Sequence, residues 1–540
     1  MIICLCRPLH DIIKELESGQ MKKLQKDVMN EIMSHQSLTP YSKEDVAKHN
    51  KPDDAWVLID GLVYDVTKFY KFHPGGAQLL LSTAGTDATE DFKMVHRMDI
   101  LKKPQYQKLI VGRLNVEDLD PDQAKELLKG KIMEKWLPLG DHYWMDPRGT
   151  LKAPYYTPKH LAFQAKVRKF VREEIYPNSG KWDEAGKYPL DIHEKAYKAG
   201  IYGAPWPKEY GGTPPDGWDA FMDLIFLYEM ARCGSGGLVA SWFFTGSIAL
   251  PPILNHGSEE MKKRVAPEVI SGKAIIALGI TEPWGGSDVQ NIRCTAIADG
   301  DDYIVNGEKK FITSGMTAKY FTVAVRTDPK KKGLGGISLL LIEADRKGFE
   351  KRKIPTQGWW AGNTAYLSFE DVRVPKSNLI GKENEGFRYI MENFNHERFA
   401  ACVMCAAACH GLIEESIRFA RVRKTFGQPL IKHQVIRHKI ADMSMKTEAI
   451  YAWCEQIAYH MTQNTPHIDL GGRIALCKVL CTKTLEQCAR ETSQIFGGNS
   501  YQRGGQGELV ERLYREVRVN AIGGGSEEVM MDLGVRMAKL

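Results

Sequence analysis

After about residue 156 of this 540-residue chain, strand-forming sequence is confined to one central part. From about residue 276 to 385, apolar runs alternate with turns rich in Gly and Asp, the pattern expected of β-strands. The clearest of these runs lie at residues 303–305, 321–325 and 337–342. On both sides, apolar residues recur at helical spacing. This order, without an internal repeat, constrains the chain to a helical domain, a β-domain and a second helical domain.

The length of the chain agrees with three or four domains, at roughly 100 to 200 residues each. Ahead of the helical part lies a compact segment of mixed α and β character, with a hairpin-like run at residues 55–66. We predict a multidomain α+β protein with an N-terminal extension, a small α+β domain, a linker rich in Pro and charge, a helical domain, a β-domain and a C-terminal helical domain, at residues 1–37, 38–116, 117–155, 156–275, 276–390 and 391–540.

Composition excludes several classes of protein. Hydrophobic residues make up 43% of the chain and charged residues 26%, as in ordinary globular proteins. The net charge of +6 is small against 73 basic and 67 acidic residues, and no basic run exceeds residues 330–332, so we expect no nucleic-acid partner. No window offers the roughly 18 uninterrupted apolar residues of a membrane span, so we expect no integral membrane segment.

The chain contains eleven cysteines, an odd number with no Cys/His zinc spacing, which favours reduced thiols in a reducing compartment. Cys402, Cys405 and Cys409 share one helix face, as metal ligands could. Because their neighbours are mostly Ala, Val and Met, we interpret them as small core residues at a tight helix contact.

The small domain carries two histidines in recognisable surroundings. Residues 73–76 read His-Pro-Gly-Gly, and residues 84–92 read Ala-Gly-Thr-Asp-Ala-Thr-Glu-Asp-Phe ahead of His96. Together with residues 63–69, these runs resemble the cytochrome b5 domain. The resemblance implies haem b, with His73 and His96 as iron ligands. Such a haem has both axial positions filled, so it would carry single electrons rather than bind oxygen.

Four further motifs, in order along the chain, resemble those of the acyl-CoA dehydrogenases from about residue 156 to 540. They read Thr-Glu-Pro-Trp-Gly-Gly-Ser-Asp, Asn-Gly-Glu-Lys-Lys-Phe-Ile-Thr-Ser-Gly, Arg-Lys-Thr-Phe-Gly and Gln-Ile-Phe-Gly-Gly-Asn, at residues 281–288, 306–315, 423–427 and 494–499. The resemblance implies the acyl-CoA dehydrogenase fold, with an N-terminal helical domain, a middle β-domain and a C-terminal helical bundle, and it implies FAD as cofactor.

The same resemblance assigns residues to the cofactor and the substrate. Thr281 and Ser287 would contact the flavin pyrimidine ring and the thioester, and Thr313 the flavin N5. Phe311 would cover one flavin face, where Trp is usual in the family. The family binds the FAD diphosphate and adenine across a subunit interface, which implies a homodimer or a homotetramer. The remaining cofactor-binding residues would be Arg423, Thr425, Phe426, Gln494, Gly497, Gly498 and Ser526. Taken alone, Arg423 could be a solvated helix end and the Gly pair a helix C-cap.

The catalytic base is where the chain departs from most of the family. The usual Glu of a Tyr-Glu-Gly-Thr run is replaced by Gly524, within Ile-Gly-Gly-Gly-Ser. Long-chain and isovaleryl-CoA dehydrogenases place the base on the helix that matches residues 395–399, so Glu397 inherits the role and the Gly524 N–H polarises the thioester carbonyl. The alternative is that Glu397 only stabilises the first turn of a helix. Arg398 would contact the base region or CoA, or form an interhelical salt bridge.

These residues lead us to expect FAD-dependent conversion of acyl-CoA to trans-2-enoyl-CoA in fatty-acid β-oxidation. Electrons would leave through the fused haem to an acceptor that the sequence does not identify. Two alternatives stay open, an acyl-CoA oxidase that uses oxygen and a non-catalytic flavoprotein of the same fold. The run Ala538, Lys539 and Leu540 resembles the peroxisomal address, with a mitochondrion or the cytoplasm as alternative locations and the plain end of a helix as the alternative interpretation.

Overall fold

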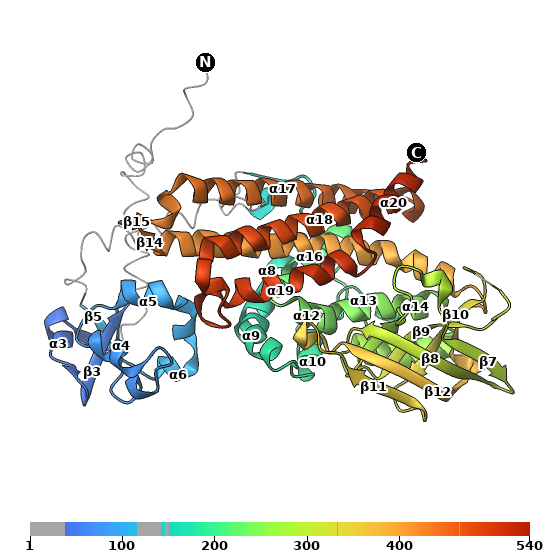
Figure 1. The fold of residues 1–540 in the computed structure, drawn as a ribbon, viewed down its shortest axis with the longest axis horizontal. Coiled ribbons are helices and arrows are strands. Elements are labelled where there is room, and N and C mark those ends of the chain that lie inside the picture. Colours follow the sequence, from blue (N-terminus) through green and yellow to red (C-terminus); the bar gives the residue numbers. More distant parts are fainter. Residues whose placement is uncertain (1–37, 116–141, 146–150, 332, 464, 540) are drawn as a thin grey trace, which may run out of the picture. The chain divides into compact units, whose positions relative to one another are not determined.

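The computed structural model describes residues 38–115, 142–145, 151–331, 333–463 and 465–539 (Figure 1). The chain divides into two compact units, which we describe separately. The first unit comprises residues 1–138, 145–152 and 421–430, and the second comprises residues 139–144, 153–420 and 431–540. The predicted N-terminal extension, most of the predicted linker and Leu540 lie outside the described residues.

The first unit contains the small α+β domain. Its five strands pair in the order β1-β5-β4-β3-β2, and the predicted hairpin at residues 55–66 is the antiparallel pair β3 and β4. Asp60 and Gly61 turn this hairpin at positive φ, as a tight two-residue turn requires. The strands are Pro40–Tyr41 (β1), Asn50–Lys51 (β2), Asp54–Ile59 (β3), Leu62–Asp65 (β4) and Ile110–Leu114 (β5), and the main helices are Lys43–Ala47 (α3), Ala77–Ser82 (α4), Thr89–Val95 (α5) and Pro104–Gln107 (α6).

The second unit begins with a helical layer. Its central helix, α11 (Ala220–Ala231), is buried at every position from 221 to 230, so it forms the middle of this layer. Helix α8 packs on α11 and continues into a π-helical turn, Val171–Ile175. The other helices are Pro158–Phe170 (α8), Tyr176–Glu184 (α9), Asp191–Lys198 (α10), Gly236–Val239 (α12), Thr245–Ala249 (α13), Pro251–His256 (α14) and Glu259–Ile270 (α15).

The described end of the predicted linker packs on this unit. The His142 ring stacks on Tyr451 with ring centroids 3.2 Å apart, and the Trp144 indole N–H donates to the Tyr451 hydroxyl over 3.0 Å. Both linker side chains are buried. His142 and Trp144 are therefore anchored to α17 (Gln434–Thr462) by aromatic contacts and a hydrogen bond.

The β-domain is one eight-stranded sheet with the order β11-β12-β8-β7-β9-β10-β13, in which β6 also pairs with β9. Strand β9 is buried along its whole length because both faces of the sheet are covered there. The strands are Ile276–Gly279 (β6), Thr295–Asp299 (β7), Asp302–Ile312 (β8), Tyr320–Arg326 (β9), Ile337–Glu343 (β10), Phe349–Lys353 (β11), Ala365–Pro375 (β12) and Leu379–Ile380 (β13). The three strongest strand predictions correspond to β8, β9 and β10.

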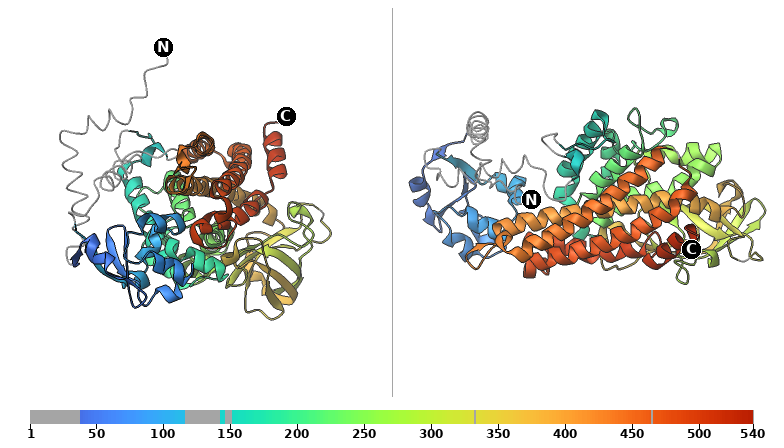
Figure 2. Two further views of the ribbon diagram at one scale, coloured as in Figure 1. Left: turned by 60° about the vertical axis from the view of Figure 1, so that its left-hand side comes forward. Right: turned by 90° about the horizontal axis from the view of Figure 1, so that it is seen from above.

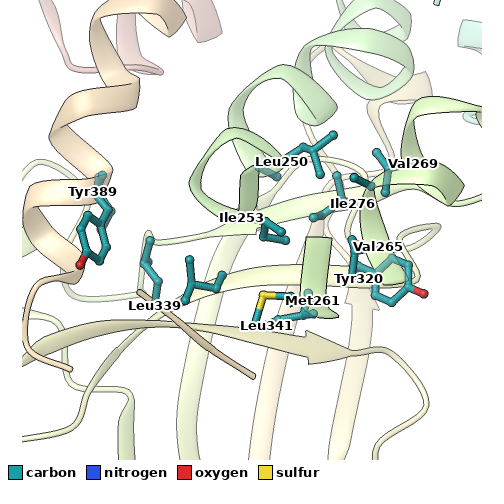
Figure 3. Close-up of a cluster of buried hydrophobic side chains, with 14 of the residues drawn as sticks. Leu250, Ile253, Met261, Val265, Val269, Ile276, Tyr320, Leu339, Leu341 and Tyr389 are labelled. Atoms are coloured by element: carbon teal, nitrogen blue, oxygen red, sulfur yellow. The ribbon is translucent and has the colours of Figure 1, made fainter. Parts of the chain in front are cut away.

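A buried apolar cluster joins the helical layer to the sheet (Figure 3). Ile253 of α14 and Val265 of α15 meet Leu339 and Leu341 of β10, and Tyr389 closes the cluster from the first helix of the C-terminal part. The burial of these side chains holds the sheet against the helices. Each fully buried aliphatic side chain contributes roughly 1.5 to 3 kcal/mol to the stability of the fold.

The C-terminal part is a bundle whose three longest helices run side by side (Figures 1 and 2). The bundle contains Gly386–Val422 (α16), Gln434–Thr462 (α17), His467–Phe496 (α18), Glu508–Ile522 (α19) and Glu527–Met537 (α20). Helix α16 begins five residues before the predicted domain start at residue 391. A Cβ at Gly386 would lie 2.6 Å from the Ser338 backbone, so glycine lets the helix begin against β10.

The cysteines of the bundle are buried and reduced. Cys402, Cys405 and Cys409 lie in the interior of α16, as expected of small core residues at a helix contact. The thiols of Cys402, Cys477 and Cys481 lie within 4.8 Å of one another. Of the unbroken helices in the described residues, α16 alone is long and apolar enough to cross a membrane, but 67% of its apolar window is buried inside the protein, as in a core helix.

Candidate active site

Glu397 is a buried acid in the interior of α16. Because the helix begins at Gly386, Glu397 lies about three turns from the N-terminus, and the alternative that it stabilises a first turn is wrong. Its side chain is 8% exposed, and Oε2 has no hydrogen-bond partner among the described residues. Burial raises the pKa of Glu397 to about 7, against the opposing effect of nearby positive charges.

Gly524 faces this acid from the loop between α19 and α20. A Cβ at Gly524 would lie 3.3 Å from Glu397 Oε1, closer than ordinary van der Waals contact. The backbone there is left-handed, with φ of 66°, which favours glycine independently. The structure therefore brings together the two residues that the sequence predicts to act on the substrate Cα and carbonyl.

Arg398, the next residue on α16, contacts the same loop. Its Nε donates to the Gly524 carbonyl over 3.2 Å, and its guanidinium lies 5.4 Å from the ring centroid of Phe394. Arg398 forms no ion pair within the part of the chain that the structure describes, so the predicted contact with the base region is the one observed. The alternative of an interhelical salt bridge is not.

His396, the residue before Glu397, is hydrogen-bonded to Asp223. The sequence did not predict this pair. His396 Nε2 lies 2.8 Å from Asp223 Oδ2 on α11. Burial alone would lower the pKa of His396, but the Asp223 carboxylate outweighs burial and raises it. The raised pKa favours the protonated imidazole, and its positive charge lowers the pKa of the neighbouring Glu397.

The first two flavin motifs are joined to each other. The Lys310 N–H donates to the Thr281 carbonyl over 2.8 Å. Below them, Lys309 and Glu282 form a fully buried ion pair at 2.8 Å, and Glu282 also accepts from the Arg293 and Cys294 amides. This network holds the end of β6 against β8. Sequence reasoning missed the pair, although a Lys inside an apolar strand face is a visible signal.

The predicted flavin-contacting residues of these motifs face outward. Phe311 is 56% exposed and has φ of 61°, an unusual backbone for an aromatic residue, while Ser287 is exposed and Thr313 half-buried. Strained backbone of this kind is concentrated at ligand sites. An exposed aromatic ring on a rigid sheet suits a planar cofactor, so the residues present fit a flavin.

The third and fourth motifs, at residues 423–427 and 494–499, contain residues that are exposed in the single chain. Phe426, at φ of 51°, is 96% exposed in the tight hairpin of β14 (Lys424–Thr425) and β15 (Gln428–Pro429), beside Arg423 and Thr425. Gly497 ends α18, as the C-cap interpretation predicts, and Gly498 and Gln494 are exposed there. Ser526 is the N-cap of α20.

The two histidines of the small domain face each other. Their ring centroids are 5.7 Å apart, and the His73 Nδ1 lies 3.3 Å from the Gly76 carbonyl, which leaves Nε2 for a metal. Burial and the neighbouring His73 lower the pKa of His96, which favours the neutral imidazole that binds iron. Phe72, Leu79 and Val95 are exposed apolar residues of the same loops and helices. These residues fit a haem.

Four parts of the chain match models of known protein families. Residues 157–273, 277–372 and 384–538 match the N-terminal, middle and C-terminal domains of acyl-CoA dehydrogenase. Residues 42–130 match the cytochrome b5-like heme/steroid binding domain.

Individual relatives match about 70% of this chain. An acyl-CoA dehydrogenase of Alternaria alternata is 38% identical over 70% of this chain and 91% of its own length. The mitochondrial long-chain specific acyl-CoA dehydrogenase of Sus scrofa is 34% identical over 71% of this chain and 86% of its own. The structure of an acyl-CoA dehydrogenase from Geobacillus kaustophilus matches with a TM-score of 0.68 and 31% identity, over 72% of this chain and all of that one.

A buried carboxylate opposite a glycine loop, flavin motifs at the ends of β6 and β8, and these matches define one class of protein. The chain belongs to the acyl-CoA dehydrogenase family and carries a cytochrome b5-like domain ahead of it. It is an FAD-dependent oxidoreductase acting on acyl-CoA, and its small domain implies haem binding. The predicted family, fold class and cofactors are thereby confirmed.

Proposed function

We propose that the protein oxidises fatty acyl-CoA to trans-2-enoyl-CoA in β-oxidation, with Glu397 as the base, and passes the electrons to its own haem. The observation that carries the proposal is the placement of the buried Glu397 carboxylate against the Gly524 loop. An acid with no partner for one oxygen is available to accept a proton.

The residues divide the work on the thioester. Glu397 takes the proton from Cα, and the Gly524 N–H donates to the thioester carbonyl as negative charge develops on its oxygen. FAD, when bound, accepts the hydride from Cβ. The acyl chain excludes water from the carboxylate, which strengthens each of these interactions.

We expect the pH dependence of kcat/KM to report the ionisation of Glu397. Because burial raises its pKa to about 7, the acid is protonated and inactive below that pH, so kcat/KM should rise with pH and level off above about 7. Initial rates from pH 5.5 to 9 with an artificial electron acceptor measure this curve. A plateau that extends down to pH 5.5 would contradict the assignment.

The direct test is product analysis without oxygen. Purified protein is incubated with straight-chain and branched acyl-CoAs of increasing length, and the CoA esters are analysed by mass spectrometry. We expect one class to yield an ester that is two hydrogen atoms lighter, in an amount at least equal to the flavin present. If every acyl-CoA is recovered unchanged, the proposed activity is wrong.

The proposed transfer from flavin to haem has to proceed in two steps. Each oxidation releases two electrons, and a haem holds one at a time. A haem held by His73 and His96 would therefore have to be reoxidised by an outside acceptor between the two transfers. An acyl-CoA oxidase is the second candidate, since an acyl carrier protein oxidase of 25% identity shares this fold. Hydrogen peroxide formed at one equivalent per enoyl-CoA in air, with the haem left oxidised, would favour the oxidase.

Location and assembly complete the proposal. The run Ala538, Lys539 and Leu540 supports a peroxisomal location, where an attached one-electron carrier would have a purpose. Masking the C-terminus with a fluorescent protein should prevent peroxisomal import, whereas a fluorescent protein at the N-terminus should not.

A homodimer or homotetramer is proposed because Phe426 is 96% exposed in the single chain. Light scattering of the purified protein measures the number of subunits.

A further inference from the structure

A buried lysine on α18 contacts the loop opposite the predicted base. Lys478 has no exposed surface, and its Nζ donates to the carbonyls of Gly523 over 2.6 Å and of Gly525 over 2.5 Å. The carbonyl between these two accepts from Arg398. All three glycine carbonyls of the loop therefore point at cations from α16 and α18.

This arrangement fixes the direction of one backbone donor. The Gly523 carbonyl and the Gly524 N–H belong to the same trans peptide, in which the two groups point in opposite directions. When Lys478 holds the carbonyl, the N–H must face away from Lys478. Among the described residues, no hydrogen bond uses the Gly524 N–H, so the donor is available to a ligand.

The lysine is placed where stability alone does not explain it. Burying an ammonium group without a carboxylate partner is unfavourable, and Lys478 forms no ion pair among the described residues. Its two acceptors are neutral carbonyls of a loop built from three glycines, which adopt no regular structure by themselves. A flexible loop held by a buried cation is typical of a site that needs a preorganised backbone.

We infer that Lys478 is a positioning residue, which clamps the Gly523 and Gly525 carbonyls so that the Gly524 N–H is held ready to polarise the thioester carbonyl of the substrate. This inference rests on the proposed function. It adds a residue that touches neither substrate nor flavin and acts through the loop.

The same lysine also acts on Glu397 through space. Positive charge at Lys478, Arg398 and His396 opposes the effect of burial on the pKa of Glu397. Asp223 faces His396 from α11, and Cys402 and Cys405 face Lys478 as neutral thiols, because burial raises their pKa values. Removing the Lys478 charge should therefore move the pH limb of kcat/KM to higher pH.

The test compares Lys478→Met with wild type by anaerobic mixing with the best acyl-CoA. We expect the limiting rate of flavin reduction to fall at least tenfold, and at most by the roughly 10²–10³-fold that loss of an oxyanion donor causes. The substrate concentration at half-maximal rate should change little. Lys446→Met is the matched control, because Lys446 links α17 to Gln487 of α18 away from the loop.

A second readout does not depend on turnover. An acyl-CoA with sulfur in place of Cβ has no β-hydrogen to transfer, and a ¹³C label at its carbonyl makes the C=O stretch visible by infrared difference spectroscopy. Polarisation should lower this frequency on binding to wild type and to Lys446→Met, and the lowering should be lost in Lys478→Met. Should that variant not fold, Lys478→Leu, which also removes both the donor and the charge, decides instead.

The outcomes separate this inference from the proposed function. If no acyl-CoA reduces the flavin of wild type, the proposed function fails. If wild type is reduced but the Lys478 variants keep its rate, its pH limb and its carbonyl frequency, the clamp is wrong and the dehydrogenase stands.

Discussion

Replacing Glu397 with glutamine should slow flavin reduction by roughly 10²–10⁴-fold, the usual contribution of a positioned general base. The amide has nearly the shape of the carboxyl group but cannot take a proton from Cα. Because the substitution also removes a buried charge, the fold should be kept and substrate should still bind. Anaerobic mixing with acyl-CoA measures the rate, and the small flavin shift on binding measures affinity.

A second glutamate on the same helix provides the control. Glu392 lies on the surface of α16, where it pairs with His256 and Arg388. Glu392→Gln should reduce the flavin at the wild-type rate. If Glu397→Gln were as fast as this control, another residue would have to be the base.

Substitution of either haem ligand should abolish the haem absorption band and leave the flavin chemistry intact. His73 and His96 approach from opposite loops, so loss of one imidazole leaves the iron without one axial bond and the porphyrin weakly held. In His73→Ala and His96→Ala, we expect acyl-CoA to bleach the flavin within about twofold of the wild-type rate, since the reaction at Cα does not involve the haem.

The control for the haem ligands is a histidine of the same domain that faces a different partner. His49 stacks on Trp56 and pairs with Asp54, so His49→Ala should keep the haem. Absorption spectra and iron content of wild type, His73→Ala, His96→Ala and His49→Ala show which histidines hold the haem. Full haem content in His96→Ala would contradict the ligand assignment.

The parts of the molecule that the sequence predicts best are those with local signals. The hairpin at residues 55–66, the strands β9 and β10 and helix α11 follow from periodicity over a few residues. Glu397 and Gly524 were predicted as a pair because the chain lacks an acid at one motif and has one at the other. Their contact across 127 positions of sequence is seen only in the structure.

Residues whose roles depend on long-range contacts carried no comparable signal. Asp223 lies in an apolar helix and Lys478 among cysteines, and neither position shows that a histidine or a glycine loop will lie against it. A lysine at helical spacing from the buried Ile474 and Ala475 was the available clue, since a cation on a core face needs a partner. The start of α16 was predicted late because Gly386 reads as a loop residue until its contact with β10 is known.

The most direct test of the account follows both cofactors at once in the wild-type protein. Oxidised protein is mixed anaerobically with a panel of acyl-CoAs while the flavin and haem bands are recorded in time. We predict that the flavin band bleaches first and that haem reduction follows. Flavin bleaching with the haem left oxidised would contradict the electron path, and a flavin unchanged by every acyl-CoA would contradict the dehydrogenase itself.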